Sequence, residues 1–135
     1  DTSPKAISIC KARFEKDLNK QFILFTGKKG FCKKKGLSAT VTLSLDVIYH
    51  LIEDKTFKNY MNELFFASEK YVIIYSSDRV DIQEAPHVKH RKFTEYVRKN
   101  FTQFELIKHI TNEFSPDKKL EDQSFADFYI YEKWK

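Results

Sequence analysis

Residues 40–51 read TVTLSLDVIYHL, and this stretch decides the fold that the sequence predicts. In residues 40–45, apolar side chains alternate with Thr and Ser, which is the pattern of a half-buried strand. Asp46 ends the alternation, and apolar side chains then recur at helical spacing over residues 57–65. We therefore expect a strand, an acidic turn and a helix in this order.

The elements after this stretch complete an α/β pattern. Residues 71–75, YVIIY, form a continuous apolar run, as in a central parallel strand covered on both faces. A helix is expected at residues 89–100, followed by strands at 104–110 and 125–131. Alternating strands and helices indicate a parallel sheet with crossover helices. The last two strands have no helix between them, so they should pair antiparallel.

The elements before this stretch are shorter. Ser3 can cap the free amides of a helix that begins at Pro4, and Cys10 lies on the apolar face of that helix, where it should be buried. Residues 21–25 read as a short strand. Residues 27–36 contain three glycines and five lysines and are predicted to be a solvated loop, in which the lysines could lower the pKa of Cys32.

Length and composition fit one domain spanning residues 1–135. Only 3 of the 135 residues are Gly, which is few for a nucleotide-binding α/β domain. Two cysteines make no disulfide framework. Apolar runs are too short for a membrane span and no signal peptide is visible, so a cytoplasmic protein with no membrane contact is expected. Because the chain does not begin with Met, we also expect that its natural start is missing.

Four stretches together resemble the C-terminal part of a class I S-adenosylmethionine-dependent methyltransferase: DTSPKAI at residues 1–7, LSLDVIYHL at 43–51, YVIIYSS at 71–77 and HVKHRKFT at 87–94. They are similar to the segment after the second strand, the fourth strand, the fifth strand and the segment after it. The resemblance implies a Rossmann-like sheet, mostly parallel, with a C-terminal antiparallel hairpin and its N-terminal strands absent.

The same resemblance implies S-adenosylmethionine as cofactor and a small-molecule or metabolite acceptor. Asp1 would contact the ribose, with Thr2 and Leu45 also at the cofactor. Asp46, Tyr49 and His50 would lie near the transferred methyl group. Two other interpretations stay open, in which Asp1 only complements a helix dipole and His50 is a packed helix residue rather than a base.

The sequence departs from the family pattern where the cofactor is held. The glycine-rich loop should precede Asp1, and a lysine run follows Thr26 and Gly27 where the adenine is expected. Without the central first strand, the expected fourth strand should expose an edge. Three explanations remain: a piece of a longer protein, a homo-oligomer or other assembly that supplies the missing strands, or a decayed enzyme.

A second function is compatible with the charge. The net charge of +5 can indicate a nucleic-acid partner, although a lysine-rich proteome also explains it. The rival hypothesis is a non-catalytic module that binds RNA or a protein through residues 28–35. His87 and His90, near Asp78 and Asp81, have the spacing of metal ligands, but further ligands are not evident, so we expect no metal site.

Overall fold

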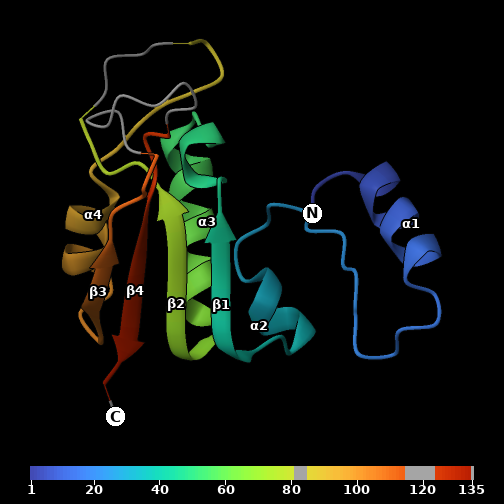
Figure 1. Cartoon of the computed structure of the whole chain (residues 1–135). Helices are drawn as coiled ribbons and strands as arrows, with labels where there is room; N and C mark the ends of the chain where they lie inside the picture. The colour runs from blue at the N-terminus through green and yellow to red at the C-terminus, as the bar shows by residue number, and fades with distance from the viewer. Residues whose placement is uncertain (81–84, 115–123, 135) are drawn as a thin grey trace.

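The computed structural model describes residues 1–80, 85–114 and 124–134, and it shows an α/β fold with one four-stranded mixed sheet. The strands are β1 (Ala39–Leu45), β2 (Ser68–Ser76), β3 (Phe104–Ile110) and β4 (Asp127–Lys133). Their order in the sheet is β1-β2-β4-β3 (Figure 1). β1 pairs parallel with β2, and β4 pairs antiparallel with both β2 and β3.

The helices in the described residues are α1 (Pro4–Arg13), α2 (Phe31–Lys35), α3 (Asp54–Phe66) and α4 (Phe93–Asn100), with a 3₁₀ turn, η1, at Ile48–His50. α3 and α4 cover one face of the sheet, whereas α1 stands apart from it beyond α2 (Figure 1). No helix in the described part of the chain is both long enough and apolar enough to cross a membrane.

The hydrophobic core lies between the sheet and the helices α3 and α4. Phe65 of α3 stacks on Phe101 at 4.2 Å between ring centroids and meets Tyr131 of β4 edge-on. Val72 and Ile74 of β2 are fully buried beneath them. Each such side chain contributes about 1.5–3 kcal/mol of burial energy, so this face of the sheet holds the fold together.

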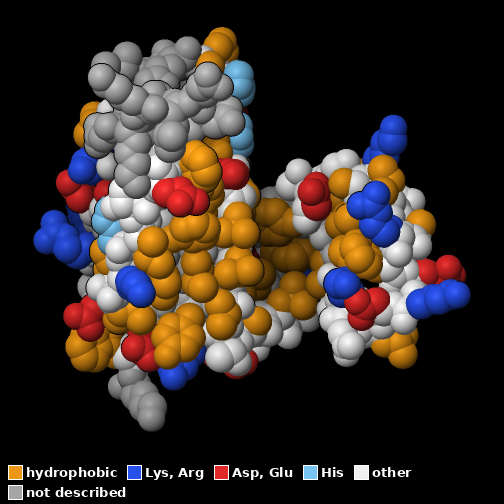
Figure 2. Space-filling model, viewed as in Figure 1, with side chains coloured by type: hydrophobic (Ala, Val, Ile, Leu, Met, Phe, Trp, Pro, Cys, Tyr) orange, Lys and Arg blue, Asp and Glu red, His pale blue; other side chains and the backbone are white. Residues whose placement is uncertain are grey.

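The opposite face of the sheet is largely uncovered. Thr42 and Ser44 of β1 bond to α3, so the residues that alternate with them point to the other side. Apolar side chains between 38% and 56% exposed gather on this open face, namely Val41, Leu43, Leu45, Ile110 and Phe128. Figure 2 shows an apolar surface over the strands on this side of the molecule.

The two edges of the sheet differ in charge. β1 has the sequence ATVTLSL, with no charged residue, and its outer edge has no strand partner among the described residues. β3, the other edge, carries Glu105, Lys108 and His109 and has an irregular register between Leu106 and Lys108. Charges and bulges of this kind protect an edge from pairing with other strands, so β3 is protected and β1 is not.

The structure confirms the strands predicted around residues 40–45, 71–75, 104–110 and 125–131, and the antiparallel pairing of the last two. The prediction that residues 71–75 are covered on both faces is wrong, because Val72 and Ile74 are buried but the side chains that alternate with them are only half-buried. The expectation of a mostly parallel sheet is wrong for the described residues, because β1–β2 is the parallel pair and the two pairings of β4 are antiparallel. Residues 115–123, between the last two strands, lie outside the described residues.

The predicted strand at residues 21–25 does not join the sheet. Its recorded backbone bonds are to the first residue: Asp1 N donates to Ile23 O, and Phe25 N donates to Asp1 O. Asp1 thus bonds to the residues on either side of the one that it faces, which is the hydrogen-bond pattern of a parallel pair of strands. Residues 21–25 therefore pair with a single residue, and a β-strand needs pairing over several residues.

α1 begins as the sequence predicts, with Pro4 in its first turn and Ser3 Oγ accepting a hydrogen bond from Ala6 N. The prediction that Cys10 is buried is wrong, because α1 has no fully buried residue. α1 stands apart from the sheet, so its apolar side chains do not pack into the hydrophobic core.

The lysine-rich segment is also different from the prediction, because residues 31–35 form the short helix α2. Glu63 of α3, only 7% exposed, accepts hydrogen bonds from the backbone amides of Gly30 and Cys32. Burial and the same carboxylate raise the pKa of Cys32 to about 11, opposite to the expected effect of the lysines. The Glu63 carboxylate therefore caps the start of α2, which has no capping side chain of its own.

Candidate functional site

The candidate site lies where the two parallel strands β1 and β2 end side by side. Asp46 follows β1 directly and has φ +56°, the only positive φ outside glycine in the described residues. Its amide donates to Tyr75 O of β2 at 3.1 Å. A non-glycine residue in the left-handed region is strained, and Asp tolerates this conformation better than most residues do. The chain therefore turns sharply at Asp46, away from the sheet and into η1.

Tyr49 of η1 turns back toward that residue. Its hydroxyl donates to Asp46 Oδ1 at 2.6 Å, and its ring packs edge-on against Phe125. Burial, together with the Asp46 carboxylate, raises the pKa of the Tyr49 phenol well above its usual range. Tyr49 therefore stays protonated near neutral pH and acts as a hydrogen-bond donor rather than as a base.

His50, the next residue, is exposed and lies against the segment that follows β2. Its Nδ1 is 3.3 Å from the carbonyl oxygen of His87, and the two imidazole rings stack at 6.2 Å. A carbonyl only accepts hydrogen bonds, so in the neutral ring Nδ1 carries the proton and Nε2 keeps the lone pair. This tautomer can accept a proton at Nε2.

A cleft of about 600 Å³ brings three of the sequence-predicted site residues together. Asp1 and Thr2 line it from the start of the chain, and His50 lines it from η1, with Gly27 also in the wall. The remaining lining residues are Phe25, Val47, Leu51, Thr56, Asn59 and Tyr60. Figure 2 shows a hollow between the sheet and the N-terminal region. The volume is in the range of small-molecule sites.

The other three predicted residues do not line this cleft. Asp46 and Tyr49 bond to each other beside it, and Leu45, 48% exposed, points to the open face of the sheet. Asp1 is partly committed to the local fold, because its Oδ1 accepts from Ser3 N at 2.7 Å. Its Oδ2 has no recorded hydrogen bond within the described residues and remains available for a ligand.

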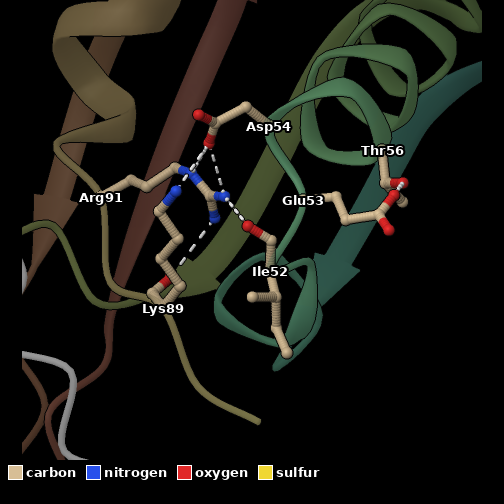
Figure 3. Close-up of polar contacts among 6 residues, drawn as sticks. All are labelled: Ile52, Glu53, Asp54, Thr56, Lys89 and Arg91. Atoms are coloured by element: carbon tan, nitrogen blue, oxygen red, sulfur yellow. Dashed lines mark hydrogen bonds and ion pairs between the residues drawn. The ribbon is translucent and has the colours of Figure 1, made fainter. Parts of the chain in front are cut away.

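The segment 87–91 binds the turn that carries Tyr49 and His50, a relationship that the sequence did not indicate. Lys89 N donates to Tyr49 O at 2.8 Å, and Lys89 Nζ lies 2.9 Å from Asp54 Oδ1. Arg91 bonds to the same carboxylate oxygen and to Ile52 O (Figure 3). The turns that follow β1 and β2 are thus joined into one structure.

Sequence reasoning also missed a buried polar cluster beneath Tyr49. Ser77 Oγ lies 2.6 Å from His90 Nδ1, and Arg79 Nη2 lies 3.0 Å from His90 Nε2. Ser77 and His90 are 2% and 1% exposed. Two serines at the end of a buried strand are the only sequence signal for it, because the pairing of Ser77 with a histidine 13 residues later depends on the fold.

In the part of the chain that the structure describes, no three His, Cys, Asp or Glu side chains are grouped closely enough to hold a metal ion. His87 and His90 have separate environments: His87 stacks on His50, and His90 lies in the buried cluster. Asp78 accepts hydrogen bonds from the amide and hydroxyl of Thr94, so it caps the first turn of α4. Asp81 lies outside the described residues.

The comparisons with known proteins leave the family open: no protein-family model matches this sequence, and no curated protein is significantly similar to it.

Proposed function

We propose that this chain belongs to a class I methyltransferase fold and takes part in methyl transfer from S-adenosylmethionine to a small-molecule acceptor. The observation that carries the proposal is the cleft that Asp1 and Thr2 share with His50. The resemblance assigned the first two to the cofactor and the third to the reacting centre, although some 48 positions separate them in the sequence.

The sheet supports this proposal in three ways. The expected fourth and fifth strands, β1 and β2, pair parallel, so their carboxyl ends lie together. The C-terminal hairpin is antiparallel. β1 is an unprotected edge, as expected when the central first strand of this fold is absent. The parallel-type bonds between Asp1 and residues 23–25 are in turn compatible with a second strand that ends at Asp1.

The cleft offers groups that suit the cofactor. Asp1 Oδ2 can accept a hydrogen bond from a ribose hydroxyl, and Asn59 and Thr2 add polar side chains to the wall. Phe25, Val47 and Leu51 add apolar surface. S-adenosylmethionine, when bound, supplies an electrophilic methyl group on a sulfonium sulfur. Gly27 is a lining residue, but no glycine-rich loop lies in this sequence, so these residues form only part of such a site.

A residue at the cleft can accept the proton that the acceptor loses. Transfer of the methyl group would leave a neutral thioether, and an acceptor that carries a proton would lose it. His50 Nε2 can take the proton that the acceptor loses, because the hydrogen bond at Nδ1 leaves the Nε2 lone pair free for it. Tyr49 and Asp46 hold the turn that presents His50.

The test is calorimetric titration of the longest natural protein that contains this chain with S-adenosylhomocysteine. We expect binding, and we expect Asp1→Ala to weaken it at least about tenfold because a ribose contact is lost. Asp1→Asn separates the two roles of this side chain: it keeps an acceptor for Ser3 N and removes the charge. Absence of binding to the unaltered protein contradicts the proposal.

One observation favours the alternative, a non-catalytic module that binds RNA or a protein partner. Lys28, Lys29, Lys33, Lys34 and Lys35 are all exposed around α2, and none forms an ion pair with another described residue. If they bind RNA, replacing Lys33, Lys34 and Lys35 by Gln reduces affinity and makes it less dependent on salt. A salt-independent affinity, or unchanged binding by this variant, contradicts the alternative.

A further inference from the structure

We propose that Arg91 is a positioning residue that holds the turn between β1 and α3, residues 46–53, in the geometry that places Tyr49 and His50. The consequence for catalysis rests on the proposed function, because this turn forms one wall of the cleft. The coupling between Arg91 and the turn can be measured without methyl transfer.

Arg91 lies at the centre of the contact between two turns. Its side chain is only 12% exposed, and its guanidinium stacks over the ring of Phe57 in α3 at 4.7 Å. Nη2 donates to Ile52 O at 2.6 Å and to Asp54 Oδ1 at 2.9 Å, and Nη1 lies 3.4 Å from Lys89 O (Figure 3). With its donors engaged in this way, Arg91 acts on the turn rather than on a bound ligand.

These contacts reach the site residues through short covalent paths. Ile52 is two residues beyond His50, and Asp54 is the first residue of α3. The segment that carries Arg91 also bonds the turn directly, through Lys89 N to Tyr49 O and through His87 O to His50 Nδ1. The turn is therefore held at three points, at Tyr49, at His50 and at Ile52. Arg91 makes the contact at Ile52, near the end of the turn.

Lysine cannot replace arginine in this role. The planar guanidinium bonds a carbonyl and a carboxylate at once while it stacks on an aromatic ring, whereas an ammonium is a point charge without a stacking face. Lys89 already supplies an ammonium to Asp54 Oδ1. Arg91→Lys therefore keeps the charge but loses the bond to Ile52 O and the packing on Phe57.

The experiment uses the full-length protein with ¹³C-labelled histidine, and the imidazole signals of His50 are assigned with His50→Gln. We compare Arg91→Lys with Arg98→Lys, which alters an exposed arginine of α4 outside this contact. All spectra are recorded well below the unfolding midpoint of each variant. We expect Arg91→Lys to shift the His50 signals and to weaken S-adenosylhomocysteine binding about tenfold, because the cleft wall moves. Arg98→Lys should change neither.

A second variant covers the case in which Arg91→Lys does not fold. Asp54→Asn removes the carboxylate but leaves Ile52 O in place, so we expect a smaller shift of the same His50 signals. Unchanged His50 signals and unchanged affinity in every folded variant, even with a lower midpoint, mean that Arg91 is merely structural and overturn the inference. If the unaltered protein does not bind S-adenosylhomocysteine, the proposed function fails, and the His50 shift alone decides the role of Arg91.

Discussion

The hydroxyl of Tyr49 donates a 2.6 Å hydrogen bond to Oδ1 of Asp46, three residues earlier, across the turn that leaves β1. Asp46 is thereby under two constraints, since its backbone is in the left-handed region and its side chain accepts the hydrogen bond of the Tyr49 hydroxyl. The two constraints can be separated by choosing substitutions that remove one at a time.

Three substitutions at Asp46 should differ in stability in a defined order. Asp46→Asn keeps an acceptor and tolerates the positive φ, so its free energy of unfolding should stay within about 0.5 kcal/mol of the parent. Asp46→Gly removes the strain but also removes the partly buried hydrogen bond from the Tyr49 hydroxyl, which costs about 0.5–1.5 kcal/mol. Asp46→Ala adds about 1–2 kcal/mol of backbone strain to that loss. Urea denaturation measures all three, and equal stability of the Gly and Ala variants contradicts the backbone argument.

Asp54 should make the stability of the protein depend on acid pH. Lys89 first, and then Arg91, hold the pKa of this carboxyl at about 2, below its ordinary value near 3.8. A lowered folded-state pKa stabilises the fold above the unfolded-state pKa, and this contribution is lost as pH falls from about 4 to about 2. Asp54→Asn should flatten the pH dependence of the unfolding midpoint in this window. Asp17→Asn, which removes an exposed ion pair with Lys20, is the matched control.

Cys32 should react slowly with thiol reagents at mildly alkaline pH. Its pKa of about 11, raised by burial and by Glu63, leaves little thiolate at pH 8.5, where an ordinary cysteine is half ionised. In a Cys10→Ser background, the iodoacetamide rate should keep rising up to about pH 11. Glu63→Gln should shift this profile to lower pH, because it removes the negative charge. A rate that levels off near pH 8.5 in the unaltered site contradicts the raised pKa.

The chain on its own should self-associate through the uncharged edge and open face of β1. Leu43, 56% exposed, lies on that face with Val41 and Leu45, and an exposed apolar face beside a strand edge that lacks a partner in the described part of the chain favours association with a second chain. Leu43→Lys should shift the protein toward monomer in sedimentation velocity over a range of concentrations. Ile107→Lys, on the protected edge β3, should leave the distribution unchanged. A parent chain that is monomeric throughout contradicts this prediction.

The strands of the sheet could be predicted because their signals are local. The alternation in residues 40–45 and the apolar run at 71–75 predicted that these segments are strands. They did not predict which face is buried, because Leu43 is exposed whereas Ser44 is buried against α3. Residues 21–25 have a similar composition but no neighbouring strand beyond one residue, and a strand exists only when it is paired. Strand pairing depends on the whole sheet, so the composition of residues 21–25 could not show that this segment does not form a strand.

The site could be predicted only in part, for a related reason. Asp1, Thr2 and His50 line one cleft, whereas Asp46, Tyr49 and Leu45 lie outside it. The Arg91 contacts could not be predicted, because no periodicity links residue 91 to residues 52 and 54. The helix α2 was missed for the same reason: the group that holds its first amides, Glu63, is about 30 residues away in the sequence.

The unequal edges of the sheet limit how far such an assembly can grow. Two chains that meet at β1 in a two-fold arrangement use up the receptive strand of each, and the strand left outside on either end is β3, with its charges and irregular register. Growth by strand addition would therefore stop at a dimer. The difference between the two edges disfavours open-ended fibres.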